Sequence, residues 1–328
     1  MADEFDIIHR YFAPLTRGNE AALDLTDDAA VVAQTTGFEH VVTTDAIVSG
    51  VHFLIDESPE NIAARLCASN LSDLAAMGAA PVGFTLAAAW PKGTEERFIA
   101  AFADGLGRWV DEYDFPLLGG DTVTTPGPMM FSLTAIGTVE AGKALKRTGA
   151  QPGDTVYVSG TIGDGGLGLM AAKGELSGLS DAHRDFLAGR FRCPTPRIAA
   201  GRALIGRATA CIDVSDGLVQ DLGHICEVSA VSMRIDAAAV PLSDAARAAL
   251  DADPALLETV LAGGDDYELA FTAHQTPPPG DVPLTAIGEV ISGTGGVSVV
   301  DTSGNPVKIA HGGYNHFAAQ PPKDAPKA

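Results

Sequence analysis

Apolar side chains in the first half of the chain recur at two different spacings. Residues 94–113 follow the period of a helix, and the apolar positions on one side are Phe98, Phe102, Leu106 and Trp109. A second helix is predicted to begin at Pro59, with Ser58 as its N-cap, and to end near residue 77. A short helix is expected at 4–11. Strand-like runs are predicted at 29–33, 40–43, 83–90, 115–118 and 130–139.

A turn-prone stretch at residues 149–154 divides this pattern. In the second half we predict helices at 165–172, 181–191, 196–205 and 217–228, and strands at 155–159, 210–213, 232–235, 267–272, 285–290 and 297–300. Helices and strands do not alternate strictly, which favours an α+β (mixed α/β) fold over a doubly wound sheet. We expect two domains, 1–148 and 149–317, followed by a disordered Ala-, Pro- and Lys-rich tail, 318–328.

Charge and cysteine content narrow the class of protein. The 328 residues contain 42 Asp and Glu against 21 Lys and Arg, a formal charge of −21. This excess argues against nucleic acid or an anionic membrane as partner. No apolar run reaches ~18 residues and the N-terminus does not resemble a signal peptide. The four cysteines show no C-x-x-C spacing, so a reducing cytoplasm is expected.

Aspartates accompanied by glycine, serine or threonine recur in six segments. The segments are 26–28, 43–45, 70–73, 119–121, 213–216 and 263–266, each following an apolar stretch. Hard oxygen ligands of this kind favour Mg²⁺, which usually accompanies phosphate. Because the chain is so acidic, a phosphorylated ligand would need such cations or local arginines and backbone N–H groups.

Three of these segments differ in how strongly they indicate a site. Asp73 lies in a helix that is apolar on nearly every face, where an ionised carboxylate is costly unless it is paired or metal-bound. The alternative is a narrow wet stripe shared with Asn70. Residues 119–121 are expected to form a flexible turn that approaches a ligand. In segment 213–216, Ser215 or Asp216 could simply cap the following helix.

A glycine-rich stretch, residues 163–168, matches G-x-G-x-x-G after a strand and before a helix. It lacks the second strand ending in an acidic residue some 20 positions later, which disfavours dinucleotide binding. A P-loop motif is absent from the sequence. His52 is either structural or a ligand contact near Asp45. Arg147 is a basic island, either a phosphate clamp or a surface cation.

In their order along the chain, these motifs are similar to those of the thiamine-monophosphate kinase family, within the superfamily of aminoimidazole ribonucleotide synthetase and selenophosphate synthetase. The stretches that carry the resemblance are 42–53, 70–79, 118–122, 147–154, 213–218 and 263–269. Thr26 replaces a usual Gly, Asp265 a usual Glu, and Asn315 a usual Asp.

The resemblance implies an ATP-dependent kinase that phosphorylates thiamine monophosphate to thiamine diphosphate. It implies a homodimer whose interface is formed by the N-terminal mixed sheet. Implied Mg²⁺ ligands are Asp27, Thr43, Thr44, Asp45, Asp73, Asp121, Asp213 and Asp216. Implied ATP contacts are Gly120, Asp121, Arg147 and Ser215, with Tyr113 packing near the nucleotide. Implied contacts to the thiamine phosphate are His52, Asp265 and Tyr314.

The chemistry agrees with this resemblance, because an acceptor phosphate is already ionised near neutral pH and needs no strong general base. Two alternatives stay open. Another ATP-dependent synthetase of the superfamily is one, although the first cysteine, Cys67, lies inside an apolar helix and does not suit selenophosphate synthetase. A non-catalytic nucleotide- or metal-binding regulator is the other.

Overall fold

The computed structural model describes residues 4–27, 29–278, 280–309 and 312–314. Its first part is built on a four-stranded sheet in the order β1-β4-β2-β3. The strands are β1 (Phe38–Val48), β2 (Ala80–Pro91), β3 (Leu117–Thr125) and β4 (Met130–Glu140). β4 pairs antiparallel with β1 and β2, whereas β2 and β3 are parallel. This mixed sheet confirms the fold class expected from the irregular order of elements.

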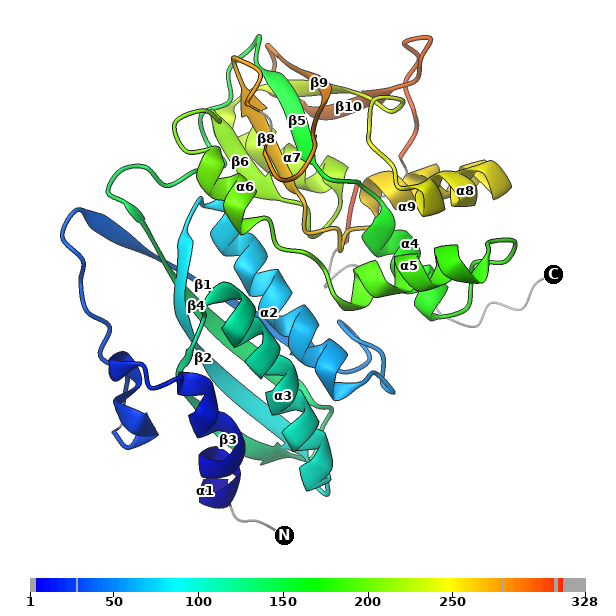
Figure 1. The fold of residues 1–328 in the computed structure, drawn as a ribbon. Helices are drawn as coiled ribbons and strands as arrows, with labels where there is room; N and C mark the ends of the chain where they lie inside the picture. The colour runs from blue at the N-terminus through cyan, green and yellow to red at the C-terminus, as the bar shows by residue number, and fades with distance from the viewer. Residues whose placement is uncertain (1–3, 28, 279, 310–311, 315–328) are drawn as a thin grey trace.

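Two long helices, α2 (Pro59–Ala76) and α3 (Glu96–Tyr113), pack together on one face of this sheet (Figure 1). Both confirm predicted helices. The Ser58 hydroxyl accepts the Asn61 backbone N–H, as the N-cap prediction required. α2 is buried on almost all sides because it lies between the first sheet and the second part of the molecule. Its polar residues therefore face either the core or the junction between the two parts.

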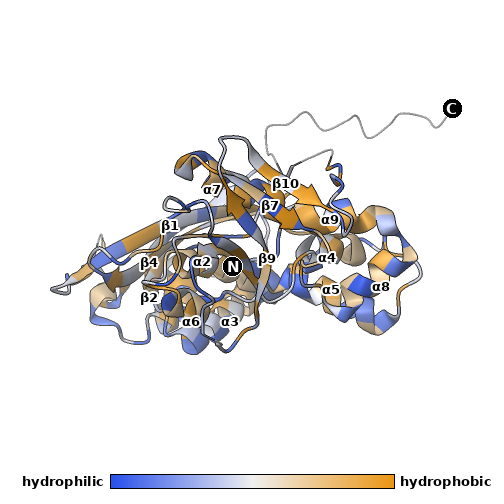
Figure 2. Ribbon diagram, turned by 90° about the horizontal axis from the view of Figure 1, so that it is seen from above, coloured by the Kyte–Doolittle hydropathy of each residue, from blue (hydrophilic) through white to orange (hydrophobic). Residues whose placement is uncertain are grey.

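The second part contains a six-stranded sheet in the order β10-β7-β9-β5-β8-β6. Its strands are β5 (Thr155–Ser159), β6 (Ala210–Asp213), β7 (Ser232–Asp236), β8 (Leu269–Ala273), β9 (Leu284–Ile291) and β10 (Gly296–Val300). Its helices are α4 (Asp164–Ala172), α5 (Asp181–Arg192), α6 (Ile198–Ala203), α7 (Leu218–Ser229), α8 (Asp244–Ala252) and α9 (Leu257–Ala262). Figure 2 shows β10 largely in the hydrophobic colour, and Met233 and Ile235 of β7 and Val299 of β10 are buried in the core of this part.

Short helical turns complete the fold. The predicted helix at 4–11 is divided into α1 (Glu4–Ile7) and a π-turn, η1 (Ile8–Phe12). Two 3-10 turns follow, η2 (Ala13–Thr16) and η3 (Glu20–Leu25), and a third, η4 (Pro254–Leu256), precedes α9. Within the described ranges, no helix has the length and apolar character needed to cross a membrane.

Several sequence-based expectations were wrong. Residues 29–33 form no strand where they are described. β1 is longer than predicted, so Thr43, Thr44 and Asp45 lie inside a strand. β8 begins at Leu269, and the prediction missed α8 and α9. The tail 318–328 lies outside the described residues.

Residues 119–121 also form part of a strand, β3, instead of the flexible turn that was expected. Gly120 stands opposite Leu86 of β2, and a Cβ added to it would lie 2.1 Å from the Leu86 carbonyl oxygen. The close backbone approach that the glycine permits is therefore to the neighbouring strand.

Candidate active site

A central cavity of about 320 Å³ lies between the two parts of the molecule. It is lined by β1, α2, the turn after β6, the loop before β8 and Tyr314. Packing brings together eight of the residues singled out in the sequence, namely Asp45, His52, Asp73, Asp213, Ser215, Asp216, Asp265 and Tyr314. These residues come from distant segments, so their convergence is a property of the tertiary fold.

One half of the central cavity holds a carboxylate cluster, which we define as Asp45, Asp73, Asp213 and Asp216. Burial, followed by the charges of Asp213 and Asp45, raises the pKa of Asp73 to about 7. Burial and then neighbouring Asp221 raise the pKa of Asp213 to about 7 as well. Burial also raises the pKa of Asp45. Buried carboxylates that disfavour each other's ionisation form an environment that a cation would relieve.

Hydroxyl groups hold two of these carboxylates in place. The Thr43 hydroxyl donates to Asp73 Oδ2 at 2.5 Å, and the Ser72 hydroxyl donates to Asp213 Oδ2 at 2.8 Å. Asp73 therefore faces other carboxylates and Thr43 of β1. The alternative, a wet stripe on α2, does not describe this position, because Asn70 is fully buried and donates to the Leu66 carbonyl.

The turn that carries Ser215 and Asp216 is fixed by a residue that sequence analysis missed. Oδ2 of the buried Asp221 accepts the backbone N–H groups of Ser215, Asp216 and Gly217 at 3.0–3.1 Å. The Ser215 carbonyl accepts from the Asp265 backbone N–H. Neither Ser215 nor Asp216 caps α7, whose N-cap is Gly217 without a side-chain bond. The side chains of Ser215 and Asp216 line the cavity, and Asp216 Oδ2 also accepts from Gln220 Nε2 at 3.2 Å. An acid in the first turn of the helix was the available signal for Asp221.

The other half of the central cavity combines aromatic rings with an ion pair. Arg65 of α2 pairs with Asp265 and stacks on Phe191 at 4.3 Å from the ring centroid. Nδ1 of His52 accepts the Val48 backbone N–H at 3.0 Å, which keeps the imidazole proton on Nε2. Sequence analysis missed Arg65, although a lone arginine in an apolar helix was a usable signal.

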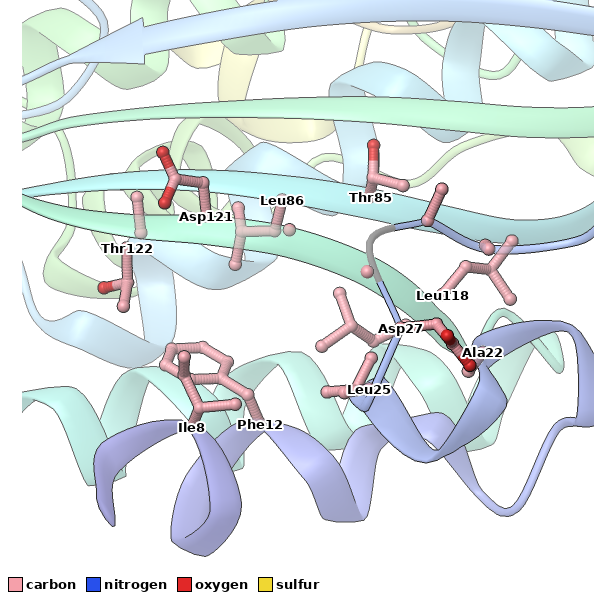
Figure 3. Close-up of a pocket in the computed structure, with 16 residues that line it drawn as sticks. Ile8, Phe12, Ala22, Leu25, Asp27, Thr85, Leu86, Leu118, Asp121 and Thr122 are labelled. Atoms are coloured by element: carbon pink, nitrogen blue, oxygen red, sulfur yellow. The ribbon is translucent and has the colours of Figure 1, made fainter. Parts of the chain in front are cut away.

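Other predicted residues lie in separate places. Asp27, Gly120 and Asp121 line an edge cavity of about 340 Å³ between the N-terminal helical turns and β2–β3. Figure 3 shows the Asp121 carboxylate pointing away from Ile8 and Phe12, which close the cavity from below. Thus the single chain does not bring these three residues to the carboxylate cluster.

Two more predicted residues lie away from the central cavity. The Thr44 hydroxyl donates to the Leu133 carbonyl at 3.1 Å and points opposite to Thr43 along β1. Tyr113 stacks on Trp109 and lines a third cavity with Arg197. Arg147 is exposed, and its charge offsets a small part of the rise that burial causes in the pKa values of Asp73, Asp213 and Asp221, so it acts electrostatically on the central cavity.

The glycine-rich stretch 163–168 is occupied by the protein itself. Asp266 accepts the backbone N–H groups of Gly163 and Gly165 at 2.8 and 2.9 Å. A Cβ on Gly165 would lie 2.2 Å from the Asp265 carbonyl oxygen. Because an internal carboxylate uses these amides, they do not offer the phosphate site of a dinucleotide fingerprint.

Comparison with known proteins agrees with the motifs. Residues 26–139 match the family model "AIR synthase related protein, N-terminal domain", and residues 151–274 match the corresponding C-terminal domain. A thiamine-monophosphate kinase of Caulobacter vibrioides is 43% identical over 89% of this chain and 85% of its own. That of Salmonella typhimurium is 41% identical over 96% of this chain and 98% of its own.

Solved structures show the same fold. The thiamine-monophosphate kinase of Stenotrophomonas maltophilia K279a has a TM-score of 0.80 and 40% identity, covering 91% of this chain and 98% of its own. A structure described as AaThiL complexed with AMPPCP and TMP has a TM-score of 0.78 and 30% identity, covering 96% and 97%. Together with the ordered motifs around the central cavity, these similarities show that the chain belongs to the thiamine-monophosphate kinase family.

Proposed function

We propose that the protein is a thiamine-monophosphate kinase, which transfers the γ-phosphoryl group of ATP to the phosphate of thiamine monophosphate. The observation that carries this proposal is the central cavity, in which the carboxylate cluster faces His52, Asp265 and Tyr314. A similar protein has been solved in complex with TMP and with AMPPCP, which is an ATP analogue, and this similarity supports the proposal. The products would be ADP and thiamine diphosphate.

Mg²⁺ suits the oxygen donors of the carboxylate cluster. In the part of the chain that is described, no three Asp, Glu, His or Cys side chains form a ready-made metal group. Mg²⁺ does not require one, because it is usually held by one or two carboxylates, waters and substrate phosphates. We propose as ligands in the central cavity Asp45, Asp73, Asp213 and Asp216, with Thr43 beside Asp73, and as ligands in the edge cavity Asp27 and Asp121. The Thr44 hydroxyl, which the resemblance also implied, is bonded to the Leu133 carbonyl and is left out of this set. When bound, the ions would neutralise the two phosphate groups that must meet.

The side chains of this protein would then act by positioning. Arg147 would clamp the nucleotide phosphates, with Gly120, Asp121 and Ser215 as further ATP contacts. Tyr113, which the resemblance placed near the nucleotide, lines the third cavity and is left out of this proposal. His52 would donate its Nε2–H to the thiamine phosphate, and Asp265 and Tyr314 would contact the same substrate. No general base is needed, since the attacking phosphate oxygen is already ionised.

We also propose that the chain is divided into two domains, 1–148 and 149–317. We propose further that two copies of the chain associate through the outer face of the first sheet. Val42 and Val123 on that face are 62% and 48% exposed, and Phe38 and Met130 are exposed as well. A patch of large apolar side chains on a sheet face is typical of an interface. Asp121 is exposed near Val123 on the same strand, so a partner subunit could complete its site.

Association is tested by Val42→Asp, which places a charge in the proposed interface. Light scattering after size exclusion should report a dimer for the wild type and a monomer for the variant. A wild type that is monomeric at micromolar concentration would refute the interface.

We propose that the protein resides in the cytoplasm. This is supported by its four unpaired cysteines, Cys67, Cys193, Cys211 and Cys226, because a reducing compartment keeps thiols free.

The kinase proposal is tested with purified protein, ATP, Mg²⁺ and thiamine monophosphate. We expect equal amounts of ADP and thiamine diphosphate, and no product when EDTA is added. ADP formation only with formylglycinamidine ribonucleotide would instead support a synthetase of the superfamily. ATP binding without turnover of either substrate would support a non-catalytic regulator.

A further inference from the structure

Arg65 joins three elements at the substrate half of the central cavity. It is only 5% exposed, although it carries a full charge. One guanidinium nitrogen donates to the Phe191 carbonyl at 2.6 Å, and the other pairs with Asp265. Its guanidinium carbon lies 4.3 Å from the centroid of the Phe191 ring. A buried cation with this many directed contacts is held in one orientation.

Arg65 has a distinct electrostatic position. Among the described residues that line the central cavity, it is the sole lysine or arginine. Its charge is compensated first by Asp265, which comes from the second part of the molecule and lies 200 positions away in the chain. Arg65 is therefore a contact between the two parts that also forms the cavity wall.

Asp265 adopts a backbone conformation that needs support. Its φ is 64°, in the left-handed region that disfavours residues other than glycine, and Tyr267 nearby has a φ of 53°. In the described part of the chain, Arg65 and the Tyr267 hydroxyl both donate to Oδ1 of Asp265. This arrangement leaves Oδ2 for a ligand while the carboxylate is held from one side.

We propose that Arg65 is a positioning residue for substrate recognition, which orients Asp265 toward the cationic ring of the acceptor substrate. This inference rests on the proposed function, because thiamine monophosphate carries a positively charged thiazolium ring. The guanidinium of Arg65 donates to the Phe191 carbonyl and to Asp265. We therefore expect it to act on the substrate indirectly, by orienting Asp265. Removing it should weaken binding of the acceptor and leave the nucleotide half of the cavity unaffected.

A competing explanation is that Arg65 only holds the two parts together. Arg192 provides a matched comparison, because it joins the end of α5 to Glu57, just before α2, at 3.0 Å. Arg192 and Glu57 are absent from the residues that line the central cavity. A variant of Arg192 therefore removes a bridging arginine without touching Asp265.

The experiment compares Arg65→Met, Arg65→Lys, Asp265→Asn, Arg192→Met and the double variant Arg65→Met/Asp265→Asn in steady-state kinetics. Loss of a charged hydrogen bond predicts a roughly 10- to 100-fold rise in KM for thiamine monophosphate in Arg65→Met. KM for ATP should stay within about twofold of wild type by the same reasoning, and Arg65→Lys should recover part of the loss. The double variant should be no worse than Asp265→Asn, because the two residues act as one unit.

Three results would overturn the inference: an equal rise in KM for both substrates, the same acceptor defect in Arg192→Met, or additive losses in the double variant. If wild-type protein does not turn over thiamine monophosphate, the proposed function fails separately. The variants are then compared by thermal midpoint. Arg65→Met and Asp265→Asn should each lower it, and the double variant should lower it no further. Additive lowering would refute the coupling itself.

Discussion

Replacing Asp73 by asparagine should inactivate the protein and at the same time stabilise its metal-free form. Burial and the neighbouring charges of Asp213 and Asp45 raise the pKa of Asp73 from an ordinary 3.8 to about 7. An asparagine resembles the protonated acid in size and can still accept the hydrogen bond from Thr43. Its amide group could also donate to the neighbouring carboxylates, which the ionised aspartate cannot do.

The size and sign of the effect follow from the two pKa values. Because the folded-state pKa is raised, the contribution of Asp73 to stability is present below pH 3.8 and is lost as the pH rises through about 7. At ~1.4 kcal/mol for each pH unit, the full loss is ~4 kcal/mol near pH 8 and ~1 kcal/mol near pH 4.5. Asp73→Asn should recover most of this loss in the absence of metal.

Urea denaturation with EDTA, at pH 4.5 and pH 8, measures this difference directly. Asp73→Asn should exceed wild type in unfolding free energy by ~2–4 kcal/mol at pH 8 and by ~1 kcal/mol or less at pH 4.5. Added Mg²⁺ should stabilise wild type more than the variant, whose turnover should fall at least ~100-fold. A variant less stable than wild type at pH 8 would refute the account of repelling carboxylates. Wild-type turnover in the variant would remove Asp73 from the proposed ligands.

Three further changes and one control variant probe other parts of the site. Asp221→Ala leaves three backbone N–H groups without their acceptor and should cost ~3–5 kcal/mol in urea denaturation and reduce turnover. As a control, Asp154→Asn changes another buried carboxylate that does not line the central cavity, and its KM for ATP should equal that of wild type. Gly120→Ala should lower the thermal midpoint strongly or abolish folding, because the new Cβ would collide with the Leu86 carbonyl; a folded, fully active variant would contradict that geometry. Arg147→Met should raise KM for ATP roughly tenfold and leave KM for the acceptor nearly unchanged, and an unchanged KM for ATP would make Arg147 a simple surface cation.

The sequence by itself determined the chemistry of the site and the order of most elements. Helical spacing identified α3, and the N-cap Ser58 followed by Pro59 correctly identified the start of α2. Asp73 stood out because a carboxylate in an apolar helix requires a partner. These features are local, since periodicity, capping and the cost of burial depend on residues within a few turns of one another. The family was recognisable because its motifs occur in a fixed order.

Only the tertiary structure decided which groups serve as partners for one another. Arg65 and Asp265 form an ion pair although they are 200 positions apart in the chain. Asp266 accepts the backbone N–H of Gly163, which lies 103 positions away. A local pattern cannot show that an internal carboxylate fills a glycine-rich turn, or that Gly120 is required by β2. Nor could it show that Asp73 joins the central cavity while Asp121 lies in the edge cavity. The physical reason is that long-range pairing and packing, which no local period encodes, select the side chains that finally meet.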